Sequence, residues 1–207
     1  VLIVSNHQSH LDPPLHGSSI IRRIRYMARL SLFNSKPFAW LIHNLGSIPI
    51  DRDGVGLDGI KKTLRALKSG EGVLLFPEGE RSMCGTIRPF MSGFTTLAIK
   101  GKAAIVPAAI EGAYDAFPRG AKFPRIFGRR IHIIYGKPIP YEEIVKYDEK
   151  ELIQLVEREV QRLHAELCSH PAIARQRARL HRDSNNVCDS DDKSCDQCIA
   201  KPEKGEA

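Results

Sequence analysis

Several features that would indicate other classes of protein are missing from this sequence. Its 207 residues contain no run of the roughly 18 consecutive apolar residues that a membrane-spanning helix requires. No basic segment followed by an apolar core marks a secretory signal peptide. A Gly-x-Ser-x-Gly motif is also absent, which argues against a hydrolase built on a nucleophilic serine. These absences favour a globular domain whose chemistry does not depend on a nucleophilic serine.

Aromatic residues are scarce, at 7% with a single tryptophan. Proteins that bind single-stranded nucleic acid combine a clustered basic stripe with aromatic side chains on which bases stack. The arginines of this chain are instead dispersed along the sequence. The sequence therefore predicts no nucleic-acid partner.

The cysteines are five in number, and an odd count without a signal peptide argues against a disulfide framework. Cys195 and Cys198 form a lone Cys-x-x-Cys pair. Cys188 and His181 could complete a zinc site with them, but no second pair with matching spacing is present. We therefore expect free thiols, a reducing compartment and no bound metal.

The net charge of +7 lies entirely within the segment 1–170, where lysines and arginines outnumber acidic residues by 24 to 17. The segment 171–207 holds seven of each kind. A basic folded body suits an anionic partner, such as a membrane surface or a phosphorylated substrate. The alternative is that this charge only keeps the protein soluble.

Short apolar runs alternate with helical patterns over the segment 1–170. The runs predict strands at 1–5, 24–28, 46–50, 73–76, 103–110 and 131–135. The helical patterns span 37–45, 58–68, 94–100 and 149–167. This alternation predicts a single α/β domain over residues 1–170, with a mixed, largely parallel sheet flanked by helices.

The two ends of the sequence also differ from the regular pattern of the rest. The chain opens at Val1 in the middle of an apolar run, so we expect an upstream part of the domain to be missing. The periodic pattern stops at Pro171, and residues 171–207 are predicted to be a polar, disordered tail.

A polar cluster, Asn6-His7-Gln8-Ser9-His10-Leu11-Asp12, follows the first predicted strand directly. His7 could act as a general base near neutral pH, and Asp12 could accept its Nδ1 proton and so fix the tautomer. His10 competes for the role of base. In the non-catalytic alternative, Asp12 caps a helix that begins at Pro13-Pro14 and His7 is merely polar.

A second polar turn, Phe76-Pro77-Glu78-Gly79-Glu80-Arg81-Ser82, follows the strand predicted at 73–76. Gly79 allows a tight backbone and the close approach of a ligand. Arg81 offers a planar fork for phosphate, and Glu78 could anchor that arginine or hydrogen-bond a substrate hydroxyl. The alternative is a surface turn that carries an ion pair. Arg52, at the end of the block 46–52, is a second candidate phosphate ligand, although exposed arginines are usually only solvated.

The segment Gly54-Val55-Gly56-Leu57-Asp58-Gly59 matches the dinucleotide-binding pattern Gly-x-Gly-x-x-Gly. Its surroundings do not fit that function. Asp51 and Asp53 stand between the preceding strand and the first glycine, where they would repel a pyrophosphate, and the helix is predicted to begin only near Asp58. We therefore expect no nucleotide cofactor.

Four blocks in this order resemble the signatures of the glycerolipid acyltransferase family, of the 1-acylglycerol-3-phosphate acyltransferase type. Asn6-His7-x-Ser9-x-x-Asp12 is similar to the family motif N-H-x-S-x-x-D, and residues 76–82 are similar to F-P-E-G-T-R-S. Residues 46–52 resemble the second family block and Val106-Pro107 the fourth. The resemblance covers about residues 1–140.

The resemblance implies a role for each matched residue. His7 would be the catalytic base and Asp12 its partner. The phosphate and glycerol parts of the acceptor would be bound by Arg52, Glu78, Gly79 and Arg81. It also implies an α/β fold at the cytoplasmic face of a membrane, held peripherally or by an N-terminal segment that this chain lacks.

Two positions depart from the family pattern. Glu80 replaces the usual threonine and adds a negative charge beside the expected phosphate site. Met91 and Ser92 stand where family members often carry lysines. Both departures bear on the identity of the acceptor more than on the reaction.

The expected reaction is transfer of a fatty acyl group from acyl-CoA or an acyl carrier protein to a hydroxyl of a lysophospholipid or glycerol phosphate, without a metal or organic cofactor. His7 would take the proton of that hydroxyl, whose oxygen attacks the thioester carbonyl. The alternative is a non-catalytic module of the same fold that binds anionic lipids. Loss of His7 or Asp12 would mark that alternative, and both residues are present.

Overall fold

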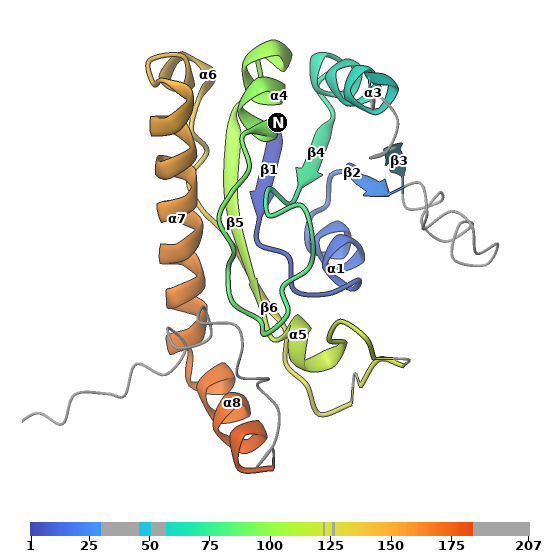
Figure 1. Ribbon diagram of the computed structural model, residues 1–207, viewed down its shortest axis with the longest axis vertical. Helices are drawn as coiled ribbons and strands as arrows, with labels where there is room; N and C mark the ends of the chain where they lie inside the picture. The colour runs from blue at the N-terminus through green and yellow to red at the C-terminus, as the bar shows by residue number, and fades with distance from the viewer. Residues whose placement is uncertain (30–45, 51–56, 122, 126, 184–207) are drawn as a thin grey trace, which may run out of the picture.

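The computed structural model describes residues 1–29, 46–50, 57–121, 123–125 and 127–183. Its strands and helices alternate along most of the chain (Figure 1). In chain order they are β1 (Leu2–Ser5), α1 (Asp12–Ser19), β2 (Ile24–Arg29), β3 (Ser47–Ile50), α3 (Leu57–Lys68), β4 (Gly72–Leu75), α4 (Gly93–Gly101), β5 (Ile105–Glu111), α5 (Ala113–Ala116), β6 (His132–Tyr135), α6 (Tyr141–Ile144), α7 (Glu149–Ser169) and α8 (Pro171–Asp183).

The six strands form one sheet in the order β3-β2-β4-β1-β5-β6. All neighbouring pairs are parallel except β5 and β6, which are antiparallel. The central strand β1 pairs Leu2 with Val73 on one side and with Ile105 on the other. Pro49 lies in the edge strand β3, where the missing N–H of proline is tolerated. The predicted mixed, largely parallel sheet is therefore confirmed.

The larger core lies on the face of the sheet that α3, α4 and α7 cover. Leu2 and Val4 of β1 point into it, whereas Ile3 belongs to the core on the other face, because successive side chains of a strand alternate. Phe94 of α4 is fully buried at its centre. Burial on both faces explains why the central strands read as continuous apolar runs.

The long helix α7 has both a start signal and an apolar stripe. Asp148 accepts a hydrogen bond from the N–H of Glu151, and the Glu151 side chain accepts one from the N–H of Asp148, which together form a capping box. One face of the helix is buried along its length, at Leu152, Val156, Val160, Leu163 and Leu167. The helix predicted over 149–167 is confirmed and ends two residues later.

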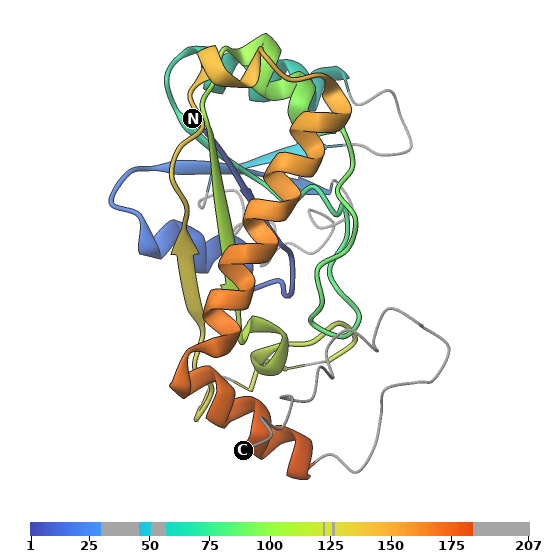
Figure 2. The same cartoon turned by 90° about the vertical axis from the view of Figure 1, so that its left-hand side faces the viewer.

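The opposite face of the sheet carries a smaller core that includes Ile3 and Leu74, with Phe76 and Tyr135 packed against it. Helix α1 lies on this side, across the sheet from α4 (Figure 2). Its buried His16 packs its ring against those of Phe76 and Tyr135. This position keeps α1, and the loop that leads into it, close to the ends of β1 and β4.

The prediction of a disordered tail from residue 171 onward is wrong for residues 171–183, which form α8. This helix is mostly polar, but Ile173 is fully buried and Gln176 nearly so. The Ile173 side chain and the buried amide of Gln176 therefore hold this segment, whose described side chains form no apolar stripe. The described residues do not include the helix predicted at 37–45, Arg52 or residues 184–207. Among the described helices, none has the length and apolar character needed to cross a membrane.

Candidate active site

The candidate site lies at the carboxyl ends of β1 and β4, where parallel sheets commonly bind ligands. Asn6, directly after β1, exchanges two hydrogen bonds with the backbone of Ile110 in β5, at 3.0 and 2.9 Å. The N–H of Ser82 donates to the carbonyl of His7 at 2.8 Å. These bonds hold the loop after β1 against the turn after β4.

Asp12 is the fixed point of the loop. Its side chain is fully buried, and Oδ2 lies 2.8 Å from Nδ1 of His7. The same oxygen accepts the N–H groups of Gln8 at 2.6 Å and Ser9 at 2.8 Å. The capping alternative is wrong, because the residue at the N-cap of α1 is Leu11 and the Asp12 carboxylate binds the loop that precedes the helix.

His7 is held in a defined orientation. Its ring stacks on Phe76 with 4.0 Å between centroids and 12° between planes. Because the Asp12 carboxylate accepts from Nδ1, the neutral ring carries its lone pair on Nε2. Nε2 has no hydrogen-bond partner within the described part of the chain, and the side chain is 17% exposed. This nitrogen can therefore take a proton from a bound hydroxyl.

His10 is the competing base, and its surroundings differ from those of His7. Burial, followed by the positive charges of Arg81 and His7, lowers the pKa of His10 to about 4. A group with so low a pKa is a weak base at neutral pH. The structure therefore favours His7, which has the carboxylate partner that fixes its tautomer.

Glu78 joins the two motifs. Its side chain is nearly buried, and its two oxygens accept the N–H of His7 at 2.8 Å and the N–H of Arg88 at 3.1 Å. Burial raises the pKa of Glu78 to about 8, although these two N–H donors oppose the rise. This position differs from an exposed turn with an ion pair. A contact between Glu78 and substrate stays a prediction.

Gly79 and Arg81 complete the turn. Gly79 has φ +74°, in the left-handed region that favours glycine, and its N–H donates to the carbonyl of Phe76 at 3.1 Å. Arg81 is half-buried and close enough to His10 to lower its pKa. The structure thus brings His7, Asp12, Glu78, Gly79 and Arg81 into one region, while Arg52 lies outside the described residues.

Glu80 does not stand as an isolated negative charge beside this region. Its carboxylate forms ion pairs with Arg88 and with Arg119, the second at 3.0 Å. Its pKa is lowered, mainly by the hydrogen bonds from these two arginines. The expected repulsion between Glu80 and an acceptor phosphate is therefore offset by two cations of the protein.

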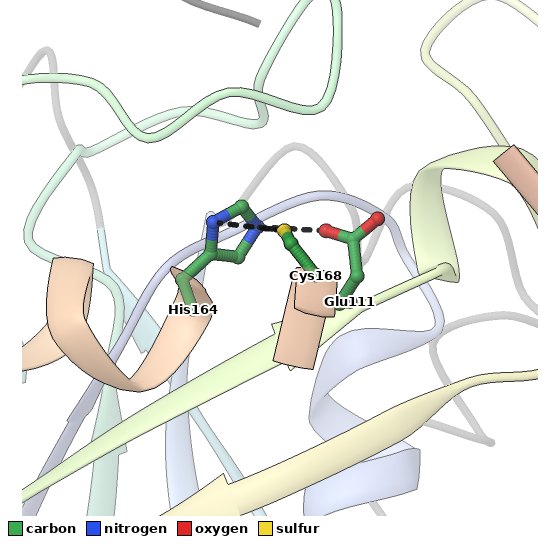
Figure 3. A group of neighbouring side chains, drawn as sticks. All are labelled: Glu111, His164 and Cys168. Atoms are coloured by element: carbon green, nitrogen blue, oxygen red, sulfur yellow. Dashed lines mark hydrogen bonds and ion pairs between the residues drawn. The ribbon is translucent and has the colours of Figure 1, made fainter. Parts of the chain in front are cut away.

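A second polar cluster, which the sequence did not reveal, adjoins the loop 6–12. Gln8 donates from Nε2 to Glu111 Oε2 at 2.8 Å. The Glu111 carboxylate also binds His164 Nε2 at 2.7 Å and the guanidinium of Arg177 at 2.8 Å. Cys168 Sγ lies 3.7 Å from His164 Nδ1 (Figure 3). The cluster connects the loop next to His7 with α7 and α8.

Glu111, His164 and Cys168 are of the residue types that bind zinc, and their ligand atoms lie within 4.8 Å of one another. The charges, however, favour an ion pair. Burial lowers the pKa of His164, but its hydrogen bonds to Cys168 and Glu111 outweigh this and raise the pKa to about 9. His164 and Arg177 therefore both present positive charge to Glu111, and a metal ion would have to displace it.

Sequence patterns could not have located this cluster. Gln8 occupies a variable position of the first motif, and Glu111 is 53 residues from His164 and 66 from Arg177. The one local signal was the spacing of His164 and Cys168, which places both on one face of a helix. Without Glu111 that pair has no evident function.

Known proteins are similar to this chain in sequence and in fold. A family model described as Acyltransferase matches residues 1–111. The 1-acyl-sn-glycerol-3-phosphate acyltransferase of Bacillus subtilis is 32% identical over 69% of this chain and 72% of its own length. The chloroplastic enzyme LPAT1 of Arabidopsis thaliana, of the same name, is 31% identical over 66% of this chain but only 38% of its own.

A solved structure agrees with these sequence matches. The 1-acyl-sn-glycerophosphate (LPA) acyltransferase PlsC from Thermotoga maritima superposes with a TM-score of 0.67 at 25% identity, covering 82% of this chain and 66% of that one. The catalytic loop and the turn after β4 both lie within the region that the family model matches. The chain therefore belongs to the acyltransferase family and is an O-acyltransferase.

Proposed function

We propose that this chain transfers a fatty acyl group from acyl-CoA or an acyl carrier protein to the free hydroxyl of 1-acylglycerol 3-phosphate, in phospholipid synthesis. The observation that carries the proposal is the His7–Asp12 pair, with 2.8 Å between Nδ1 and Oδ2 and with Nε2 left to a substrate. The names of the relatives from Bacillus and Arabidopsis support this choice of acceptor.

The reaction needs one base and an orienting group. His7 Nε2 takes the proton of the acceptor hydroxyl while its oxygen attacks the thioester carbonyl, and Asp12 stabilises the imidazolium that forms. Collapse of the tetrahedral intermediate breaks the carbon–sulfur bond, and the imidazolium returns the proton to the leaving thiolate. An ester and a free thiol result, so the reaction requires no metal or organic cofactor.

The acceptor is held through its phosphate in this proposal. Arg81, beside the catalytic loop, and Arg52 supply guanidinium groups, which match phosphate oxygens in a bidentate manner. Glu78 holds the backbone N–H groups of His7 and Arg88, and Gly79 sets the turn, so both shape the space for the glycerol part. Holding acceptor and thioester in register supplies much of the rate.

Because such an acceptor resides in a membrane, we place the protein at the cytoplasmic face of one, bound peripherally or through a further segment. The excess of positive charge over the segment 1–170 supports contact with an anionic surface. A purely binding module of this fold is disfavoured, since the base and its carboxylate partner are both in place.

The test is a transfer assay with the purified protein. Oleoyl-CoA and an oleoyl acyl carrier protein serve as donors. The acceptors are 1-oleoylglycerol 3-phosphate, glycerol 3-phosphate and 1-oleoylglycerophosphocholine, and products are identified by mass spectrometry. We expect phosphatidic acid from the first acceptor with at least one donor and little product from the choline lipid. Faster acylation of the choline lipid, or full activity of folded His7→Ala, would contradict the proposal.

A further inference from the structure

A cavity of about 170 Å³ lies between the loop that precedes β6 and helix α8. Four arginines are among the residues that line it, Arg129 and Arg130 of the loop and Arg175 and Arg179 of the helix. A water molecule occupies roughly 30 Å³ in the liquid, so the space accommodates a group the size of a phosphate with some water.

The fold builds this cavity without a ligand. The nearly buried side chain of Gln176 accepts the N–H of Arg130 at 2.6 Å and donates to the carbonyl of Arg130 at 3.2 Å and to Asp115 at 3.1 Å. Gly112 has φ +89°, and a Cβ there would lie 2.1 Å from the Arg130 carbonyl oxygen, so only glycine permits this approach. Loop and helix are therefore locked together.

The charge inside the cavity is not balanced by the described protein. None of the four arginines forms an ion pair with a described carboxylate. Burial raises the pKa of the nearby Asp115 carboxyl, and the charge of Arg129 opposes this rise. Arg177, on the same helix, shows the contrast, because it pairs with Glu111 at 2.8 Å. Four like charges around one space repel one another, and a bound anion relieves that repulsion. Guanidinium groups suit phosphate oxygens in particular.

Two large apolar side chains are exposed in the loop that leads into the cavity. The side chain of Phe127, directly before Gly128, is 99% exposed, and that of Phe123 is 79% exposed. Large exposed aromatic side chains next to basic ones are typical of surfaces that contact the boundary between headgroups and acyl chains. A free phosphate ion would gain nothing from contact with these aromatic side chains, whereas a membrane lipid would.

This surface belongs to the same end of the molecule as the catalytic loop. Ser9 Oγ donates to the carbonyl of Phe117 at 2.8 Å, and Arg119 pairs with Glu80. Strands β1 and β4 point toward the end at which α5 and α8 lie (Figure 1). A membrane in contact with α8 and the loop would therefore meet the end that carries His7.

We propose that the arginine-lined cavity between residues 128–130 and α8 binds the phosphate of an anionic membrane lipid, with Phe123 and Phe127 entering the headgroup region beside it. The site orients the enzyme on the bilayer that holds its acceptor, and in that respect it rests on the proposed function. It is separate from the site for the reacting lipid, because none of the residues that line it belongs to the loop 6–12 or to the turn 76–82.

The test measures binding to vesicles without catalysis, so it remains valid if the proposed reaction fails. The purified protein is sedimented with vesicles of phosphatidylcholine alone and with vesicles of phosphatidylcholine mixed with phosphatidylglycerol, at low and high salt. Arg129→Glu/Arg175→Glu should weaken binding to the anionic vesicles about tenfold or more. The matched control is Arg65→Glu/Lys100→Glu on α3 and α4, which lie at the other end of the molecule (Figure 1). It changes the net charge equally and should retain most of the affinity.

The outcomes separate a local site from general charge. Equal losses in the two double variants would overturn the proposal in favour of diffuse attraction, and unchanged binding of Arg129→Glu/Arg175→Glu would also overturn it. Phe123→Ser/Phe127→Ser should reduce the binding that persists at high salt severalfold. Its control, Ile99→Ser/Val145→Ser, removes exposed apolar side chains elsewhere and should not.

A last arm distinguishes a lipid phosphate from the phosphates of coenzyme A. With a short-chain acceptor that stays monomeric in solution, the variant Arg129→Glu/Arg175→Glu should keep the wild-type KM for oleoyl-CoA within about twofold. A tenfold rise in that KM, with unchanged vesicle binding, would assign the cavity to the donor and overturn the proposal.

Discussion

The described residues include two histidine–carboxylate pairs that have similar bond lengths but different surroundings. His7 Nδ1 lies 2.8 Å from Asp12, and His164 Nε2 lies 2.7 Å from Glu111. The first pair is formed within one loop, five residues apart. The second joins β5 to α7 across 53 residues.

The remaining partners of each pair decide what it can do. Asp12 also accepts two backbone N–H groups of the same loop, and Nε2 of His7 has no hydrogen-bond partner among the described residues. Glu111 also binds Arg177 and Gln8, while the other nitrogen of His164 faces Cys168. A histidine whose pKa lies near 9 is protonated at neutral pH and cannot accept a proton there.

The difference shows that a short histidine–carboxylate distance does not by itself identify a base. A base requires an accessible ring nitrogen and a carboxylate fixed by neutral donors. Where a second cation shares the carboxylate, the pair serves to hold elements together. Substitutions at equivalent positions of the two pairs should therefore separate activity from stability.

The largest contrast should come from the histidines. We expect His7→Ala to lower kcat about a thousandfold or more, since a general base typically contributes 10²–10⁴. Its melting temperature should change less than that of the second variant, because Asp12 keeps the N–H groups of Gln8 and Ser9 as donors. His164→Ala should instead lower the melting temperature by several degrees, since it leaves Glu111 with fewer partners, and should keep kcat within about tenfold. Steady-state kinetics and thermal unfolding of the same preparations measure both, and a reversed pattern would contradict the assignment.

The carboxylates should show the next largest contrast. Asp12→Asn removes the acceptor that fixes the His7 tautomer, so kcat should fall about a hundredfold or more with an unchanged far-UV spectrum. Glu111→Gln leaves His164 and Arg177 without their counter-charge and should act on stability more than on kcat. Equal kinetic effects of the two variants would mean that the Glu111 cluster takes part in the chemistry.

Two arginines, one near each pair, should show the same contrast between activity and stability with a smaller effect. Arg81→Ala should raise KM for the phosphorylated acceptor roughly ten- to a hundredfold, as expected for loss of a charge-assisted hydrogen bond of about 1.5–3 kcal/mol. KM for the thioester should hardly change, and Arg81→Lys should rescue in part. Arg177→Ala should leave both KM values near those of the wild type and lower the melting temperature. An Arg81→Ala effect confined to the thioester would move this arginine to the donor site.

The sequence predicts the first pair because all of its determinants are local. A buried apolar run ends at Ser5, and His7 and Asp12 follow within one loop, at a spacing that lets the carboxylate reach back. The sheet is predictable for a similar reason, since central parallel strands are apolar on both faces. Boundaries shift by a residue or two, as they do where helix ends fray.

The second pair and α8 escape prediction because their determinants are distant. Gln8 and Glu111 are separated by 103 residues, and only the folded sheet brings them together. Among the side chains of α8 whose burial is described, Ile173 is the one buried apolar residue, and the contacts of Gln176 with Arg130 also hold the helix. Pro171 in its first turn is the signal that could have indicated a new helix.

The smallest effect, and the one most specific to the second pair, concerns pH. The folded pKa of His164 is about 9, above the roughly 6.5 of an unfolded histidine. Its contribution to stability is therefore fully present below about pH 6.5 and is lost as the pH rises through 9. On the acid side, His164 and Arg177 lower the pKa of Glu111 despite its burial, so the contribution of that carboxylate is lost only as the pH falls below its usual range.

We compare melting temperatures of the wild type and His164→Gln, which keeps a polar side chain but not the titrating charge. The wild type should melt a few degrees higher near pH 6, and the gap should close toward pH 9.5. Glu78, whose pKa is raised to about 8, also makes stability change with pH, but it does so in both proteins and cancels in the difference. A gap that stays constant for His164→Gln would mean that this histidine is neutral in the fold, and would contradict its ion pair with Glu111.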